Sequence, residues 1–150
     1  MKPYILYAIA AGIAWGLGGY FEKAGLRTLG LPPLAGIMLR TTIAFILLGA
    51  LSVPVWKTYT PSNNIIGWVM IILGGGVIAG TLGMWSFYAS LSTAENLGVA
   101  LAVAFALSPV TGTIVGLLTR TQSLDWRSGI GLCAIIVGIV LIQLAHKPKP

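Results

Sequence analysis

Five long apolar segments, separated by short polar connections, dominate the pattern of hydrophobic and polar positions along the chain. We place these segments at about residues 4–21, 34–53, 65–88, 96–118 and 126–144. A helix that crosses a bilayer needs about 20 mostly apolar residues, and each segment meets or nearly meets that length. The segments lack the alternation of a membrane barrel strand and are about twice as long as such a strand needs. The pattern therefore predicts an all-α integral membrane protein with five transmembrane helices in one bundle, forming a single domain.

Glycine is frequent in these segments, with 20 residues in the chain. In a membrane bundle, helices are held together by close packing, and small residues at i and i+4 allow that approach. Such spacing occurs at Gly12 and Gly16, and again at Gly112 and Gly116. A third pair, Gly76 and Gly80, lies in the third segment, so we expect three contact faces between helices.

The composition points to the same class of protein. Hydrophobic residues make up 57% of the 150 residues, and only nine Lys/Arg and three Asp/Glu are present. Charged residues therefore account for 8%, against roughly 25% in soluble domains, too few to cover a soluble surface. This excludes a soluble globular enzyme and a disordered chain. The net charge of +6 is scattered without a basic stripe, so no nucleic-acid partner is expected.

The first segment could be confused with a cleaved signal peptide. Ala8-Ile9-Ala10 has the spacing of a cleavage site, but only Tyr4 to Tyr7 separate it from Pro3. A signal peptide needs roughly 7–15 apolar residues before the cut. We therefore expect a retained membrane span.

The basic residues divide evenly between the two sides of a five-span chain. Four fall on the side of the N-terminus, namely Lys2, Lys57, Arg120 and Arg127. Four fall on the other side, namely Lys23, Arg27, Lys147 and Lys149. Arg40 makes the second count five if it reaches that side. Orientation normally follows an excess of Lys and Arg in cytoplasmic loops, so either one loop dominates or the chain inserts in both directions. The second interpretation predicts an antiparallel homodimer, which mimics an inverted-repeat transporter.

Several short motifs occur in a recognisable order. They are Ala14-Trp15-Gly16, Leu39-Arg40, Phe87-Tyr88-Ala89-Ser90-Leu91, Ser108-Pro109-Val110 and the glycine-rich stretch from Gly131 to Gly138. Together they resemble the EamA domain of the drug/metabolite transporter superfamily, over nearly the whole chain. The resemblance implies a transporter of a small metabolite or drug-like solute that works by alternating access. Many members carry two such repeats, and this chain, with one, is similar to short members thought to act as dimers.

One departure limits what the resemblance implies. Arg120-Thr121-Gln122 stands where the family often has Gly-Glu-Arg, so no role of that glutamate is carried over. The residues themselves offer little for catalysis: one histidine, His146, one cysteine, Cys133, and three separated acids form no metal cluster or catalytic triad. We expect no enzyme activity, no metal and no cofactor.

Two charged residues fall in or at the start of a span. Arg40 lies about six residues, or roughly 9 Å, into the second segment, where an ionisable residue is a functional candidate. It could instead extend to the interface or pair with a backbone carbonyl. Glu95 opens the fourth segment, either as a carboxylate favoured by the helix dipole or as a cavity residue that exchanges a proton for a substrate.

Aromatic residues accompany the remaining candidates. Glu22 falls seven residues after Trp15 and three after Gly19, so helical spacing puts all three on one stripe. That stripe could bind an organic cation, or Glu22 could be a solvated charge beside Lys23. In the third segment a polar and aromatic face either packs between helices or lines a cavity: Thr81, Trp85, Tyr88 and Ser92. We choose Trp15, Trp85 and Tyr88 as pocket residues.

The sequence therefore predicts a transporter subunit in the cell membrane of a bacterium or archaeon. Its partners are membrane lipid, a small-molecule substrate and a second copy of the chain. Two alternatives stay open, a flippase subunit for a lipid carrier and a membrane protein that serves only as an interaction partner. The substrate-binding candidates are Trp15, Glu22, Arg40, Trp85, Tyr88 and Glu95.

Overall fold

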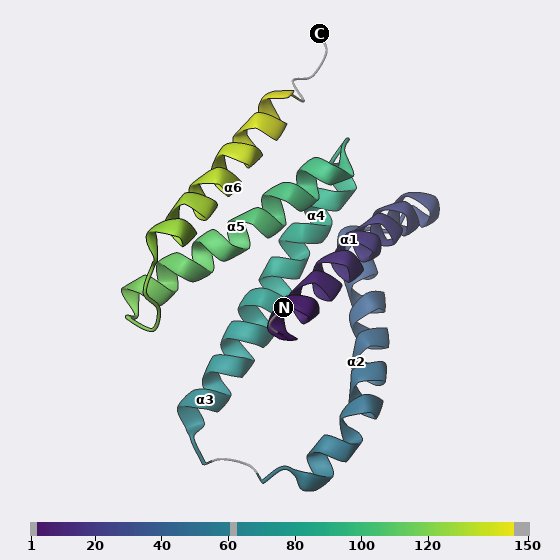
Figure 1. Ribbon diagram of the computed structural model, residues 1–150. Coiled ribbons are helices and arrows are strands. Elements are labelled where there is room, and N and C mark those ends of the chain that lie inside the picture. The colour runs from purple at the N-terminus through teal and green to yellow at the C-terminus, as the bar shows by residue number, and fades with distance from the viewer. Residues whose placement is uncertain (1–2, 61–62, 146–150) are drawn as a thin grey trace. The chain divides into compact units, whose positions relative to one another are not determined.

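The computed structural model describes residues 3–60 and 63–145 (Figure 1). Within these ranges every regular element is a helix. Five helices are long and apolar enough to cross a membrane, so the predicted fold class is confirmed. The sequence predictions also use four residues that lie outside the described ranges: Lys2, His146, Lys147 and Lys149.

The helices follow one another with short connections. Four spans are single helices: α1 (Pro3–Leu29), α2 (Pro33–Thr58), α5 (Leu97–Leu118) and α6 (Trp126–Ala145). The third span, Ile65–Thr93, is continuous but has three parts: α3 (Ile65–Val69), η1 (Met70–Gly83) and α4 (Met84–Thr93).

The first helix continues well beyond its predicted end at Phe21. It ends at Leu29, where Gly30 adopts a left-handed conformation with φ +60°. The Leu31 N–H donates to the Leu26 carbonyl at 3.1 Å, and the Gly30 N–H donates to the Arg27 carbonyl at 3.4 Å. This is the usual glycine cap of a helix C-terminus. The charged residues after Phe21 therefore lie inside the helix and do not end it.

The second helix also extends past its predicted end at Val53, with Pro54 inside it. A proline within a membrane helix frees a carbonyl, which nearby hydroxyl groups can satisfy. For Pro54 this carbonyl belongs to Ala50, four residues earlier. At the helix end, the Thr58 hydroxyl donates to the carbonyls of Val55 at 3.1 Å and Pro54 at 3.4 Å. The helix then ends after this turn, at Thr58.

The third span is wound more widely than an α-helix over Met70–Gly83, which is π-helical. The whole span begins at Ile65 and is capped by Asn64. The Asn64 side-chain oxygen accepts hydrogen bonds from the backbone N–H groups of Ile66 and Gly67. Wide winding brings the Gly75 carbonyl within 2.9 Å of where a Cβ on Gly80 would lie. Any side chain at Gly80 would therefore disturb this segment.

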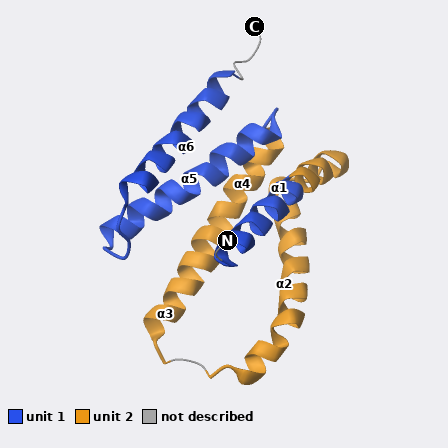
Figure 2. Ribbon diagram, viewed as in Figure 1, with its two compact units in different colours: residues 1–19, 94–150 blue, residues 20–93 orange. Residues whose placement is uncertain are grey.

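The described residues divide into two compact units (Figure 2). Unit 2 comprises residues 20–93, and within it α2 packs against α4. Unit 1 contains residues up to Gly19 together with those from Ala94 onward, and within it α5 packs against α6. The organisation of the five helices as a single domain stays a prediction.

The predicted glycine faces are not close helix contacts within either unit. An added Cβ at Gly12, Gly16, Gly76 or Gly112 would meet no atom within 4 Å. Gly116 is close to Gln122 of its own helix–loop segment, at 2.8 Å from an added Cβ. The real close approaches are at Gly19, which faces Leu101, and at Gly36.

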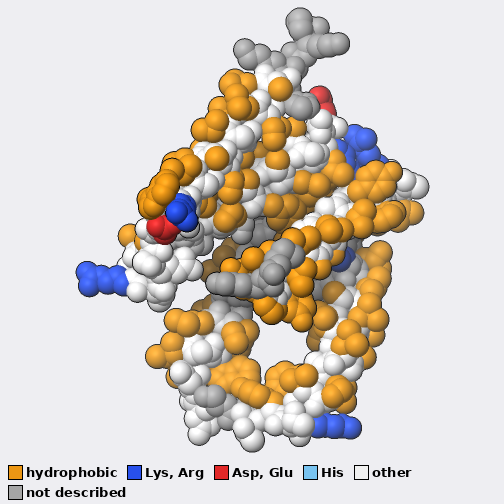
Figure 3. Space-filling model, in the orientation of Figure 1, with side chains coloured by type: hydrophobic (Ala, Val, Ile, Leu, Met, Phe, Trp, Pro, Cys, Tyr) orange, Lys and Arg blue, Asp and Glu red, His pale blue; other side chains and the backbone are white. Residues whose placement is uncertain are grey.

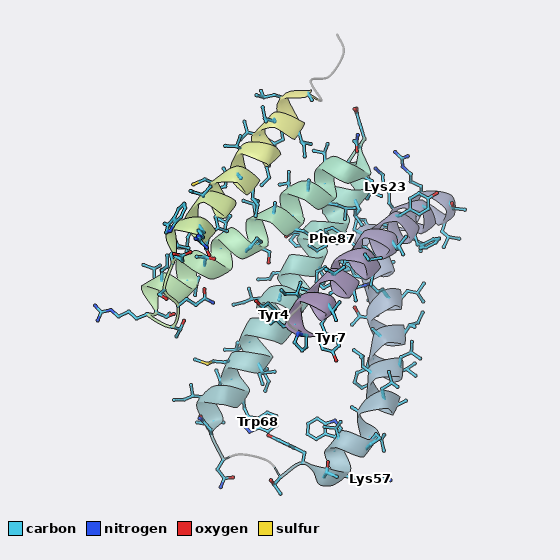
Figure 4. All side chains as sticks on the ribbon, in the orientation of Figure 1. Tyr4, Tyr7, Lys23, Lys57, Trp68 and Phe87 are labelled. Carbon is cyan, nitrogen blue, oxygen red and sulfur yellow. The ribbon has the colours of Figure 1, made fainter. Side chains whose placement is uncertain are left out.

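Few side chains are buried. In unit 2 a small hydrophobic cluster contains Leu26, Ile37 and Tyr88, and Phe87 packs against it from α4 (Figure 4). Large apolar side chains are otherwise mostly exposed, and they cover much of the surface visible in Figure 3. Exposed apolar area on this scale is unfavourable in water but suits contact with lipid tails.

Candidate functional site

Three polar side chains meet within unit 2, from three helices. The Arg40 Nε atom of α2 lies 2.8 Å from the Glu22 Oε1 atom of α1. Tyr88 of α4 makes a side-chain hydrogen bond to the same carboxylate, with its hydroxyl as the donor. The Tyr88 residue is only 2% exposed, so its hydroxyl is held in place by packing. Glu22 is thus contacted by two donors, one charged and one neutral.

Local sequence explains why these residues meet. The glycine cap at Gly30 and the short connection through Pro32 reverse the chain, so the end of α1 lies beside the start of α2. Gly36 then allows close approach: an added Cβ there would lie 2.6 Å from Leu26 Cδ2 and 3.1 Å from Tyr88 Cε1. The absent side chain of Gly36 leaves room for the Tyr88 ring against α2.

The pairing bears on two interpretations that the sequence left open. Arg40 contacts the Glu22 carboxylate and, at 3.4 Å, the Met84 sulfur. Glu22 is not a solvated charge, since its side chain is 19% exposed and ion-paired. The neighbouring Lys23 is buried as well, at 8% exposure. Charges inside a membrane-spanning helix usually pair in this way.

A cavity of about 270 Å³ adjoins this cluster. The only polar side chains among its lining residues are Glu22, Arg40 and Tyr88. The rest of its wall is apolar and includes Phe21 and Leu39. Of the paired charges, the Arg40 side chain is the more accessible, at 40% exposure. The site could therefore hold a small solute that is charged at one end and apolar at the other.

A second, larger hollow of about 620 Å³ lies between α2 and the η1–α4 part of the third span. Five apolar or aromatic side chains line it, together with the hydroxyl groups of Thr41, Thr42 and Thr81: Leu34, Ile37, Met38, Leu82 and Trp85. The Thr42 hydroxyl donates to the Met38 carbonyl at 2.8 Å and the Thr81 hydroxyl donates to the Gly76 carbonyl at 3.1 Å. Two of its hydroxyl donors are thus already used, which leaves the groove weakly polar. Figure 1 shows α2 diverging from α3 below the place where α2 and α4 pack.

The polar face predicted in the third span is therefore divided. Thr81 and Trp85 line the large groove, whereas Tyr88 lines the smaller cavity beside Glu22. Trp85 and Tyr88 lie three residues apart in the regular helix α4, which puts them about 60° apart around its axis. That separation is enough for the two side chains to face different hollows.

The remaining two candidates lie in unit 1. Trp15 stacks at a tilt against Phe105, with ring centroids 5.0 Å apart, and is 55% exposed. Glu95 is exposed in the connection after α4 and precedes the helix cap, because Asn96 accepts a hydrogen bond from the Gly98 N–H at 2.8 Å. The fourth helix thus begins after Asn96, close to the predicted start of its segment, and Glu95 does not lie in its first turn because an Asn side chain supplies the cap.

Sequence reasoning also missed some contributors. Gly36 and Met84 contact the cluster, yet neither residue type signals chemistry on its own. In unit 1 a polar cavity of about 360 Å³ is lined by Thr113, Gln122, Ser123 and Ser128 near the α5–α6 connection. Five hydroxyl and amide residues lie between Leu118 and Gly129, and three of them line this cavity: Gln122, Ser123 and Ser128.

Five apolar spans, outward-facing apolar side chains and a charged pair within the helices define an integral, multi-pass membrane protein in contact with lipid. The chain belongs to the EamA-like transporter family, whose family model matches residues 2–144. Membership confirms the resemblance and makes this a membrane protein of the transporter type, with a small-molecule substrate. Comparison with curated proteins and with solved structures gave no match.

Proposed function

We propose that the chain is a subunit of a transporter that moves a small metabolite or drug-like solute across the membrane by alternating access. One observation carries the proposal: the ion pair of Glu22 and Arg40, with Tyr88, in the wall of a cavity formed by membrane-spanning helices. Charges in a membrane span are costly and usually mark a substrate or ion pathway. Well-packed apolar residues would often serve stability equally well.

The other candidates have secondary roles in this proposal. Trp85 lines the larger groove of unit 2, and Trp15 and Glu95 are the candidate substrate residues of unit 1. Transport is coupled to protons through Glu22 or Glu95. Reconstituted protein with both residues changed to Gln should lose the pH dependence of uptake, and unaltered uptake would contradict the coupling.

We further propose that the working unit is an antiparallel homodimer in the cell membrane of a bacterium or archaeon. The even division of basic residues supports insertion in both directions. The many exposed apolar side chains leave room for a second copy as well as lipid. A topology reporter on the C-terminus should appear on both sides of the membrane, whereas a single orientation would contradict dual insertion.

The large groove favours a second candidate function, a flippase subunit for a lipid carrier. An acyl or isoprenoid chain matches a mostly apolar groove of about 620 Å³ between helices. Lipid-flipping assays and soluble-solute uptake in the same proteoliposomes separate the two functions. We favour the soluble solute because the charged cluster lines the smaller cavity.

Solute uptake into proteoliposomes that contain the purified full chain tests the main proposal. A panel of small metabolites should include at least one that accumulates, and replacement of Arg40 by Gln should abolish its uptake. Equal uptake by Lys57→Gln is the control, because Lys57 lies at the opposite end of the same helix (Figure 4).

A further inference from the structure

The arrangement around Glu22 has the form of a receptor for a carboxylate. The Arg40 guanidinium and the Tyr88 hydroxyl both direct donors at one carboxylate group. Charge-assisted hydrogen bonds of this kind are about twice as strong as neutral ones, and guanidinium groups suit carboxylates geometrically. In this structure the carboxylate belongs to the protein itself.

We propose that Arg40 and Tyr88 recognise the carboxylate of an organic acid and that Glu22 competes with this substrate for the same two donors. The inference rests on the proposed transport function and names its substrate class. The body of the acid would lie against the apolar wall, which includes Phe21 and Leu39. Glu22 then acts as an internal substitute for the substrate.

Accessibility favours an acid over an organic cation. The Arg40 side chain is 40% exposed, about twice the 19% of Glu22, so an incoming ligand meets the cation of the pair first. Tyr88 adds a second donor next to it. A cation would have only Glu22 among the lining side chains as a charged acceptor, and it would have to displace both donors from it.

Charge balance gives the inference a distinctive consequence. The paired cluster of Glu22 and Arg40 is neutral, so a bound acid adds one negative charge to the cavity. Replacing Glu22 by Gln removes the competitor and leaves Arg40 without a counter-charge. A bound acid would then neutralise Arg40, so this substitution should strengthen acid binding.

The test uses four probes with a common phenyl body: phenylacetate, its neutral amide, phenethylamine and phenylalanine. Calorimetric titration measures their binding to the purified full chain in detergent, and a thermal transition shows that each variant is folded. Phenylacetate should bind Glu22→Gln about tenfold or more tightly than the unsubstituted chain, equivalent to about 1.4 kcal/mol. Phenylacetamide and phenethylamine should gain nothing from the substitution.

Further variants separate recognition from stability. Arg40→Gln should lose phenylacetate binding, and Arg40→Lys provides a charged alternative if the first variant does not fold. Tyr88→Phe, combined with Glu22→Gln, should weaken phenylacetate binding several-fold and leave phenethylamine unaffected. Two control variants remove a negative and a positive charge outside the cavity: Asp125→Asn and Lys57→Gln. Both should leave phenylacetate binding unaltered.

Several results would overturn the inference. Phenylacetate binding that is unchanged, weakened or absent in folded Glu22→Gln would show that Glu22 does not compete with the acid. Binding of phenethylamine or phenylalanine that is lost in Glu22→Gln would make Glu22 a cation ligand.

Uptake assays with the same probes keep the two proposals apart. If phenylacetate binds as expected but is not carried, the transport function fails and this inference stands. If only the amine or the zwitterion is carried, the transport function stands and this inference fails.

Discussion

The two compact units differ in where they hold charge. In unit 2 the oppositely charged Glu22 and Arg40 lie inside helices and pair with each other. In unit 1 the charged residues within the described range all fall in connections or the first turn of a helix: Glu95, Arg120, Asp125 and Arg127. Ionisable groups at the ends of spans reach water at little cost, whereas those within spans are costly and usually mark a functional pathway. The comparison therefore supports the proposed solute site in unit 2.

The largest expected effect comes from breaking the pair. Arg40→Gln leaves the Glu22 carboxylate without its charged partner, and losing one member of a buried pair costs roughly 3–5 kcal/mol. Because the Arg40 side chain is 40% exposed, we expect about 2 kcal/mol in denaturant unfolding of the purified protein. In unit 1, Arg127→Gln should change stability by less than about 0.5 kcal/mol, since Arg127 makes a cation–π approach to Trp126, 5.5 Å from the ring centroid. Equal losses of stability in Arg40→Gln and Arg127→Gln would contradict the proposed difference between the two units.

A smaller effect is expected from two glycines, one in each unit. Gly36→Ala forces a Cβ to within 2.6 Å of Leu26 and 3.1 Å of Tyr88, both buried. We expect a cost of about 1.5 kcal/mol, in the lower part of the range for overpacking, because the end of the Leu26 side chain can shift. Gly116→Ala meets the exposed side chain of Gln122, which can move away. Thermal unfolding should therefore show a clear loss for Gly36→Ala and little change for Gly116→Ala. Gly49→Ala, with nothing within 4 Å, is the control in α2.

The smallest effect concerns two helix ends that share one cap geometry. Gly30 ends α1 with φ +60°, and Arg120 occupies the corresponding position after α5 with φ 56°. At the α5 end, the Thr121 N–H donates to the Gly116 carbonyl at 2.9 Å and the Arg120 N–H donates to the Leu117 carbonyl at 3.1 Å. A left-handed conformation costs a non-glycine residue roughly 1–2 kcal/mol.

Substitutions at these two positions should therefore act in opposite directions. Arg120→Gly should stabilise the protein by about 1 kcal/mol, and Gly30→Ala should destabilise it by about the same amount. Paired unfolding curves of the two variants provide the measurement. A loss of stability in Arg120→Gly would mean that the arginine side chain makes a contribution larger than the backbone strain.

Much of the fold could be predicted because lipid imposes a simple rule on the chain. A long apolar segment must be helical to satisfy its backbone, so the five spans were evident from hydropathy. The ends of these spans were harder to predict. The first span was predicted to stop at Phe21 because charges follow, but Glu22 has a partner in α2 and the true stop is the cap at Gly30.

The site was only partly visible in the sequence for related reasons. Glu22, Arg40 and Tyr88 were each singled out, since charges and aromatics in a span stand out against apolar neighbours. That they contact one another depends on the turn after α1 and on the space left by Gly36. The division of the predicted face between two hollows depends on which residues of α1 and α2 lie opposite α4, and the residue types of one span do not indicate that.

The most direct test of the account is solute uptake into proteoliposomes by two variants that each lose one arginine. Arg40→Gln removes the cation of the unit 2 site, and Arg127→Gln removes a cation from the first turn of α6 in unit 1. With matched amounts of folded protein, we predict uptake by Arg127→Gln at the rate of the unsubstituted chain and none by Arg40→Gln. Uptake by Arg40→Gln as fast as by Arg127→Gln would contradict the assignment of the site to Glu22, Arg40 and Tyr88.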